Sequence, residues 1–163
     1  MTKVKRSQIQ TFIDTVPSGG LGSETYNLIG DGVPSGKIAY NPKTESVTYI
    51  HLDNASVSVE SYAPTMAVEQ VAINGDAIFE YIESLRIARA VLDDAETTIV
   101  NVWMYETGGP AAYPAEQQPV CIAVEDYGGD GGSAVKLNYT IYYVGDPIPG
   151  TFNASTKAFT ATA

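Results

Sequence analysis

Residues 74–92 (NGDAIFEYIESLRIARAVL) are the single convincing helical stretch in a chain whose other segments alternate like β-strands. Their apolar side chains recur at helical spacing and give one apolar stripe. The stripe consists of Ile78, Ile82, Leu85 and Leu92. Asp76 is the natural N-cap, so we expect a helix over 76–92 that covers one side of a β-sheet. Arg89 falls within the stripe, so either the helix ends near Ala88 or Arg89 reaches a carboxylate on another segment or subunit.

The remaining segments predict strands, because apolar and polar residues alternate in them with the period of a half-buried sheet. They span residues 26–29, 46–52, 55–60, 65–72, 97–106, 119–127 and 135–143, and a last small hairpin follows with Phe152 and Phe159 as anchors. The segment at 55–60 is the cleanest, since Val57 and Val59 face one way between polar neighbours. The pattern predicts a mainly β fold with one α-helix, either a β-sandwich or a part-closed barrel with a flanking helix.

Composition limits the class of protein. With 163 residues, 44% of them hydrophobic and 17% charged, the chain is long enough for one globular domain with its own core. Its one cysteine, Cys121, excludes an internal disulfide framework, and its one histidine, His51, excludes a His-rich metal cluster. No apolar run approaches the ~20 residues of a membrane-spanning helix and no secretory signal is recognisable. We therefore expect a soluble protein made in a reducing compartment, without a membrane partner.

The charges are unevenly distributed along the chain. Lys3, Lys5 and Arg6 lie in the first six residues, where there are no acids, and the rest carries six basic and nineteen acidic residues. A surface this acidic argues against ordinary nucleic-acid binding, which requires a basic footprint. It is compatible with a wall that repels a polyanion, and equally with acidity that serves solubility alone.

Two segments are predicted to extend from a main domain at residues 25–163. Residues 1–24 are expected to form an N-terminal arm, because a basic start and a few apolar anchors precede a Gly/Pro-rich hinge. Residues 30–45 are expected to form a loop arm with Pro/Gly turns and a second basic island. The residues singled out as assembly contacts are Lys3, Lys5, Arg6, Ile9 and Phe12 in the first arm and Asp31, Lys37, Tyr40 and Lys43 in the second.

No catalytic or cofactor-binding motif is complete in this sequence. Residues 36–37 fail as part of a phosphate-binding loop, since Asp31 stands where the earlier glycine is required and Ile38 where Ser or Thr is required. The acidic groups at 93–96 and 126–130 lack the ligand spacing of a calcium-binding loop. We therefore expect neither an enzyme nor a bound metal or cofactor.

Several short runs are similar to sequences of one protein family. Residues 40–50 combine an Asn-Pro turn with a Glu and a Tyr-Ile pair, residues 57–64 are VSVESYAP, and the helix opens with GDAIFEYI from Gly75. Together with the closing GTFN run from Gly150, they resemble the major tail protein, or tail tube protein, of long-tailed bacteriophages. The central runs cover about residues 40–90 and contain no catalytic fingerprint.

The resemblance implies a β-sandwich with a flanking helix, six copies of which form a ring. The rings would stack into the tail tube, the conduit for genome ejection into the host. Expected partners are other copies of the chain, the tail tip or terminator proteins, and a tape measure inside the lumen. DNA would pass transiently without specific binding. The protein would lie in the virion tail after assembly in the host cytoplasm, with its two arms clasping neighbouring subunits or rings.

Further residues become candidates under this resemblance. Ser56, Ser58 and Glu60, the polar face of the cleanest strand, are candidates for the tube lumen, where acidic groups would keep DNA from adhering. The alternative is that they face the outer solvent. Arg86 and Arg89 are candidates for contacts between subunits.

Two other interpretations stay open. The inner tube of a contractile tail or injection system shares the implied fold, and the sequence does not separate it from a non-contractile tail. A non-viral β-sandwich binding module would instead use aromatic residues such as Trp103 and Tyr113 to stack on a ligand. Against this, Trp103 lies in a strand that is apolar on both faces and is therefore expected in the core.

Overall fold

The computed structural model describes residues 1–17 and 23–162. Within these ranges it contains one α-helix, α1 (Ala77–Ala88), and short 3-10 helices at Arg6–Gln8 and Leu92–Ala95. The strands are β1 (Ile9–Asp14), β2 (Tyr26–Leu28), β3 (Ile38–Ala39), β4 (Pro42–Val47), β5 (Ser56–Tyr62), β6 (Thr65–Val71), β7 (Glu96–Trp103), β8 (Tyr113–Gly128), β9 (Lys136–Tyr143), β10 (Ile148–Asn153) and β11 (Ala158–Ala161). The prediction of a mainly β protein with one helix is confirmed.

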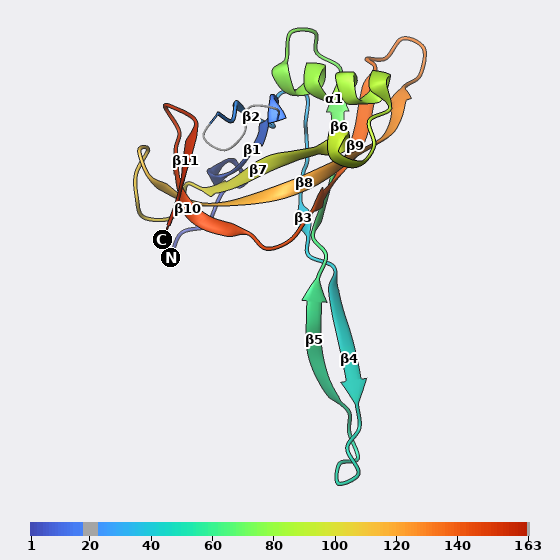
Figure 1. Cartoon of the computed structure of the whole chain (residues 1–163), viewed down its shortest axis with the longest axis vertical. Coiled ribbons are helices and arrows are strands. Elements are labelled where there is room, and N and C mark those ends of the chain that lie inside the picture. The colour runs from blue at the N-terminus through green and yellow to red at the C-terminus, as the bar shows by residue number, and fades with distance from the viewer. Residues whose placement is uncertain (18–22, 163) are drawn as a thin grey trace.

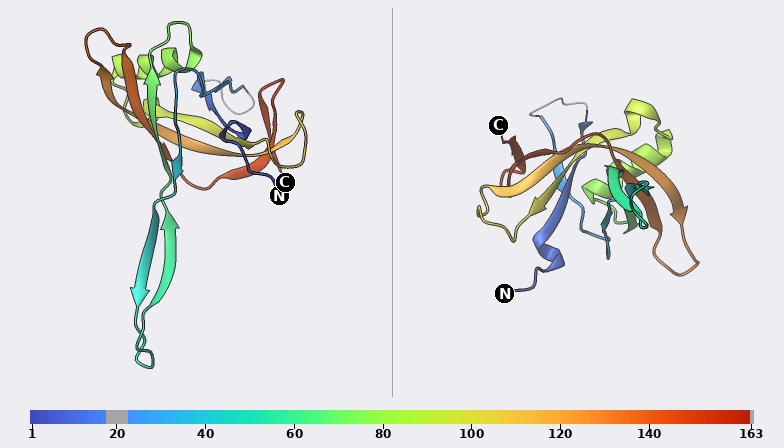
Figure 2. Two further views of the ribbon diagram at one scale, coloured as in Figure 1. Left: turned by 180° about the vertical axis from the view of Figure 1, so that it is seen from behind. Right: turned by 90° about the horizontal axis from the view of Figure 1, so that it is seen from below.

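Nine of the strands form one antiparallel sheet in the order β2-β1-β7-β8-β9-β6-β3, with β10 paired to β8 and β11 to β10. The sheet is curved but not closed into a barrel, and α1 lies across one of its faces (Figures 1 and 2). This agrees with the sandwich form of the prediction. β4 and β5 pair only with each other and form a long hairpin (residues 40–63) that projects from the rest of the protein, here called the body (Figure 1).

The larger core lies between α1 and the sheet. The helix contributes Ile78, Phe79, Ile82 and Leu85 to it. Asp76 caps the helix as predicted, because its carboxylate accepts a hydrogen bond from the backbone N–H of Phe79 (2.9 Å). The helix ends at Ala88, and Arg89 takes the left-handed conformation with φ 47°. The first alternative for Arg89 is therefore correct, and the predicted helix is too long, since Leu92 lies beyond it with an exposed side chain.

The smaller core lies on the opposite face of β1 and β7, where β10 and β11 fold over the sheet. It consists of Phe12, Tyr26, Val100, Val102, Ala115 and Phe152. The Phe12 and Phe152 rings are 4.5 Å apart between centroids, and Phe152 stands opposite Phe159 in the register of β10 and β11. The prediction of a last hairpin anchored by these two C-terminal phenylalanines is confirmed.

The N-terminal segment departs from the predicted arm over residues 1–24. Residues 9–14 form β1, which lies between β2 and β7 within the main sheet. Phe12 and Ile13 are buried on opposite faces of that strand, one in each core, so Phe12 stabilises the body and is not an exposed assembly anchor. Apolar residues at consecutive positions are typical of a strand buried on both faces. The Gly/Pro-rich hinge predicted after them lies largely at residues 18–22, outside the described ranges.

The strand predicted to be the cleanest half-buried one is β5, and every residue of β4 and β5 is exposed. Val57 and Val59 are 67% and 53% exposed. The alternation is present, but no other part of the described chain covers its apolar face. The predicted loop arm at 30–45 is also misplaced, because the projecting hairpin begins at Tyr40 and ends near Ala63.

Candidate assembly surfaces

The hairpin carries large apolar side chains that the body does not cover. Their exposed fractions range from 40% for Leu52 to 108% for Ile50. The set comprises Tyr40, Val47, Tyr49, Ile50, Leu52, Val57, Val59 and Tyr62. A group of exposed apolar residues on one projecting element is typical of a surface that binds another protein.

Few interactions of its own hold the hairpin together. Besides the backbone pairing of β4 with β5, the Lys43 ammonium forms an ion pair with the Glu60 carboxylate at 2.6 Å and holds the pKa of Glu60 below its ordinary value. The Tyr40 and Tyr62 rings meet edge to face at its base, 6.4 Å apart between centroids. An isolated two-stranded hairpin is marginally stable in water and has unpaired backbone groups along both edges. We therefore expect contacts with another chain to complete it.

Among the predicted arm residues, Arg6 lies against a loop of its own chain. Its guanidinium donates to the carbonyl oxygen of Gly36 from both Nε and Nη2 (3.2 Å each) and to that of Ile9. The structure thus brings Arg6 together with residues 30–37, the first part of the predicted loop arm, within one body. Lys3, Lys5, Asp31 and Lys37 are exposed at the surface.

One half of the sheet has a face that no other element of the described chain covers. Along β6, β9 and β8, buried residues that pack toward α1 alternate with residues on the opposite, open side. The open side is mostly polar and includes Thr65, Ala67, Glu69, Lys136, Asn138, Thr140, Tyr142, Cys121, Ala123 and Glu125; the Tyr142 ring is exposed there, and Thr140 is buried among its neighbours. The Glu125 carboxylate accepts a hydrogen bond from Thr140 Oγ1 (2.7 Å). Lys136 forms an ion pair with Glu69 between β9 and β6. The alternation in 65–72, 119–127 and 135–143 predicted a polar side for each of these strands, but not that the three sides form one open face.

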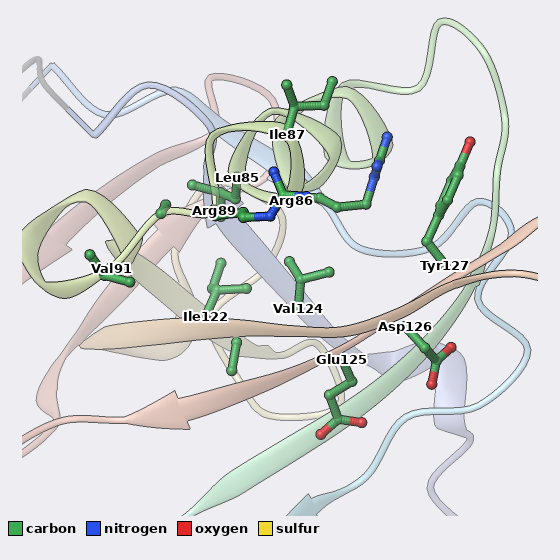
Figure 3. A pocket seen from close by; sticks show the side chains of 12 residues that line it. Leu85, Arg86, Ile87, Arg89, Val91, Ile122, Val124, Glu125, Asp126 and Tyr127 are labelled. Atoms are coloured by element: carbon green, nitrogen blue, oxygen red, sulfur yellow. The ribbon is translucent and has the colours of Figure 1, made fainter.

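A groove of about 800 Å³ lies between the C-terminal end of α1 and β8 (Figure 3). The Arg86 guanidinium lies over the Tyr127 ring, 4.0 Å from its centroid, and forms an ion pair with Glu83 at 3.1 Å. Arg86 thus has partners within its own chain, whereas Arg89 follows the end of the helix with an exposed side chain. Glu125 points away from this groove (Figure 3). The role of both arginines between subunits stays a prediction.

A second cavity of about 800 Å³ lies where the hairpin joins the body. Its lining includes the aromatic residues Tyr40, Tyr62 and Trp103 and the acidic residues Glu60, Glu116 and Asp146. Trp103 is half-buried at the end of β7, and so lies at the edge of the core in which the sequence placed it. Burial raises the pKa of the Glu116 carboxyl, and a hydrogen bond from Asn101 opposes this rise in part. Sequence reasoning missed this cavity because its walls come from distant segments.

Two other features are absent from residues 1–17 and 23–162. No three His, Cys, Asp or Glu side chains are grouped there as a metal site would require. No helix in these ranges is long and apolar enough to cross a membrane. Cys121 is a free, half-buried thiol, in agreement with its predicted place on a strand.

Comparisons with known proteins find a relative in structure but none in sequence. No family model and no curated protein matches the chain. Among solved structures, a chain from the tail of an empty GTA (gene transfer agent) particle, determined by helical refinement with C6 symmetry, matches with a TM-score of 0.63. The two chains are 15% identical, and the alignment covers 98% of this chain and 100% of the other. A likeness at this identity shows that the two chains share a fold.

Proposed function

We propose that this protein is a structural protein of a phage tail that polymerises as stacked hexameric rings into the tail tube, the conduit for genome ejection. The observation that carries the proposal is the likeness, over 98% of the chain, to a chain from a tail with C6 symmetry. The short runs that resemble major tail proteins point independently to the same class of protein.

The exposed hairpin supports polymerisation. A surface on one copy that fits a different surface on the next copy makes a heterologous contact, which closes into a ring by rotation or continues into a filament. In Figure 1 the hairpin projects from one end of the molecule along its longest axis, and α1 lies at the other end. The hairpin can therefore reach a neighbouring copy beyond the limits of its own body.

The edges of the main sheet suit ring closure. Its outermost strands are short, with three residues in β2 and two in β3, so they cover only part of β1 and β6. Exposed strand edges are a liability in a monomer, because they pair readily with other chains. Pairing between neighbouring copies in a ring would remove these edges.

Two polar surfaces are candidates for the lumen of the proposed tube. The surface predicted from the sequence, Ser56, Ser58 and Glu60, lies on the hairpin. The uncovered face of β6, β9 and β8 is a larger polar surface and carries Glu69 and Glu125. Acidic groups on a channel wall would repel DNA and keep it from adhering. Replacing the glutamates of either surface with glutamine should slow the passage of DNA through the tube. If passage is unchanged, that surface does not line the lumen.

The proposal includes the wider assembly. The protein would contact copies of itself, tail tip or terminator proteins, and a tape measure in the lumen, while DNA passes without specific binding. It would be assembled in the host cytoplasm and remain in the virion tail. An enzymatic role forms no part of the proposal.

Negative-stain electron microscopy of the purified protein over a concentration series tests the proposal. We expect rings or hollow tubes, with six subunits per ring after symmetry averaging. If only monomers form, tail-tip extract is added to supply an initiating complex. Tubes that grow only with the extract support the proposal, and persistent monomers contradict it.

Two alternatives lead to different results in further experiments. The inner tube of a contractile tail would give the same rings, and a sheath gene beside this gene would identify that case. A non-viral binding module is favoured only by the aromatic cavity at the hairpin base, where Trp103 is half-buried. That alternative predicts a monomer at every concentration and retention on a glycan column.

A further inference from the structure

The cavity at the base of the hairpin combines aromatic rings with carboxylates. Trp103, Tyr40 and Tyr62 contribute rings, and Glu116 and Asp146 contribute carboxylates from the body. An ammonium group is attracted to the face of an aromatic ring and forms short, charge-assisted hydrogen bonds with carboxylates. A cavity of about 800 Å³ is large enough for a lysine side chain and part of the backbone that carries it. The ligand class that fits this chemistry is a flexible, basic peptide segment.

Within residues 1–17 and 23–162, no Lys or Arg forms an ion pair with Glu116 or Asp146. The ion pairs present there are Lys43–Glu60, Arg86–Glu83 and Lys136–Glu69. Glu116 is therefore partly desolvated without a counter-ion, and the raised pKa of its carboxyl has this burial as its main cause. A positive charge that entered the cavity would compensate the buried carboxylate.

The segment before the first 3-10 helix carries charges of the required sign. Residues 1–5 are exposed and contain Lys3 and Lys5 with no acidic residue among them. Arg6, which follows, is bound to the carbonyl of Gly36, so the segment is anchored to the body at one end. In Figure 1 and in both views of Figure 2, the N-terminus lies away from the hairpin. The base of the segment adjoins the chain's own Trp103, because Ile9 pairs with Trp103 and Arg6 lines a pocket with it, but residues 1–5 extend away from there. The direction of residues 1–5 therefore favours a neighbouring copy as the acceptor.

We propose that Lys3 or Lys5 of one copy enters the hairpin-base cavity of the next copy, where its ammonium lies against the Trp103 ring and pairs with Glu116. The inference rests on the proposed function, because it names the surface that receives the N-terminal segment when copies assemble. It is a heterologous contact, with donor and acceptor at different places on each copy. The basic start and the acidic body thereby become the two sides of one interface.

Trp103 is the only tryptophan in the sequence, so the protein's tryptophan emission reports on this cavity. Its fluorescence is recorded over a concentration series while electron microscopy counts the rings. We expect the emission to change as rings form. Lys3→Gln/Lys5→Gln and Glu116→Gln should each raise the concentration at which half of the protein is assembled by about tenfold, the effect of losing one charge-assisted contact.

Matched variants separate charge pairing from other effects. Lys3→Arg/Lys5→Arg keeps the charge and should assemble normally, and Glu106→Gln makes the same change as Glu116→Gln at an exposed turn. Separate charge reversals, Lys3→Glu/Lys5→Glu and Glu116→Lys, should block assembly, and their combination should restore it. Glu116→Gln should not lower the stability of the monomer, because a neutral amide replaces a desolvated carboxylate.

Each possible result either supports or overturns the inference. If rings form equally well with Lys3→Gln/Lys5→Gln and the Trp103 emission stays constant, the inference is overturned while the proposed function stands. An emission change that depends on the two lysines but not on concentration indicates binding within one chain and also overturns the inference. If no rings form, a peptide of residues 1–8 is titrated into the monomer. Saturable quenching or a saturable shift of the Trp103 emission, weakened by Glu116→Gln, then supports the cavity as a site for this segment. If the emission does not respond to the peptide, the inference is overturned.

Discussion

The body and the hairpin are built from similar alternating sequences, but they differ in what covers their apolar side chains. In the body, Leu137 and Ile141 are fully buried by other parts of the same chain, whereas Val57 and Val59 on the hairpin are more than half exposed. Alternation therefore shows that one face of a strand is to be covered, but not by which chain. We expect the body to supply the free energy of folding and the hairpin to supply that of assembly.

The largest expected effect on folding comes from the smaller core of the body. Phe152→Ala removes a fully buried ring that contacts Phe12 and Tyr26. The unfolding free energy should fall by about 3–5 kcal/mol, because a large cavity replaces the side chain. Urea denaturation measures the change, and Phe159→Ala, which alters the half-buried partner ring, is the control. A loss no larger than that of the control would contradict the packing described for this core.

Alkaline pH should destabilise the body through its buried tyrosines. Burial raises the pKa of Tyr143 to about 12 and also raises the pKa values of Tyr26 and Tyr139. The folded state thus favours the protonated phenols, so their contribution is complete below the ordinary pKa near 10 and is lost as the pH rises through the folded value. The unfolding free energy should fall between about pH 10 and pH 12, on the order of 2 kcal/mol for Tyr143 alone.

Denaturation curves at a series of alkaline pH values measure this loss. Tyr143→Phe removes one of the titrating phenols, so its stability should decline less steeply with pH than that of the original protein. A stability that stays constant to pH 12 in the original protein would contradict the burial of these phenols.

A smaller effect is expected at the start of the helix. Asp76→Ala removes the acceptor of the Phe79 N–H and of the Gln70 amide, which donates to the same carboxylate at 2.8 Å. The unfolding free energy should fall by about 1–2 kcal/mol, the usual loss for an N-cap with one further buried donor. Thermal unfolding followed by circular dichroism measures it. Asp94→Ala, at an exposed position, should leave the curve unchanged, and equal losses in both variants would argue against capping.

Substitutions in the hairpin should have the smallest effect on folding and the largest effect on assembly. Val57→Ser/Val59→Ser should change the unfolding free energy of the monomer by no more than about 0.5 kcal/mol, because these side chains are exposed. The same variant should prevent rings or tubes in electron microscopy, since it removes apolar area that a neighbour would cover. Val135→Ser, at an exposed valine of the body, is the matched control. If Val57→Ser/Val59→Ser lowers the unfolding free energy of the monomer as much as Asp76→Ala does, the hairpin contributes to the stability of the body and the prediction is wrong.

Much of the fold could be predicted because its signals are local. The apolar stripe of Ile78, Ile82 and Leu85 and the cap at Asp76 depend on residues within a few positions of one another, and the structure confirms both. The apolar anchors Phe152 and Phe159 likewise identified the last hairpin. Residues 9–14 were misassigned because a six-residue strand buried on both faces has no alternation, and its apolar spacing also fits a helical turn.

The candidate surfaces were predicted less completely, since each depends on segments far apart in the chain. The sequence identified Arg6 and Lys43 as contact residues, but their partners Gly36 and Glu60 became visible only in the folded chain. The hairpin-base cavity likewise joins Trp103 to distant residues of β5 and β8. No periodicity within a window of ten or twenty residues carries such information.

By itself, the sequence determined the class of protein: a mainly β chain with one capped helix, an acidic body and a basic start. Helical and strand periods, capping and net charge follow from neighbouring residues and need no knowledge of the rest of the fold. The tertiary structure alone decided which faces are covered, because burial depends on sheet order and on the path of distant segments. It buried β1 between its neighbours and left the hairpin and one sheet face open. It also placed Glu116 beside Trp103 in a cavity where, among residues 1–17 and 23–162, no Lys or Arg forms an ion pair with it.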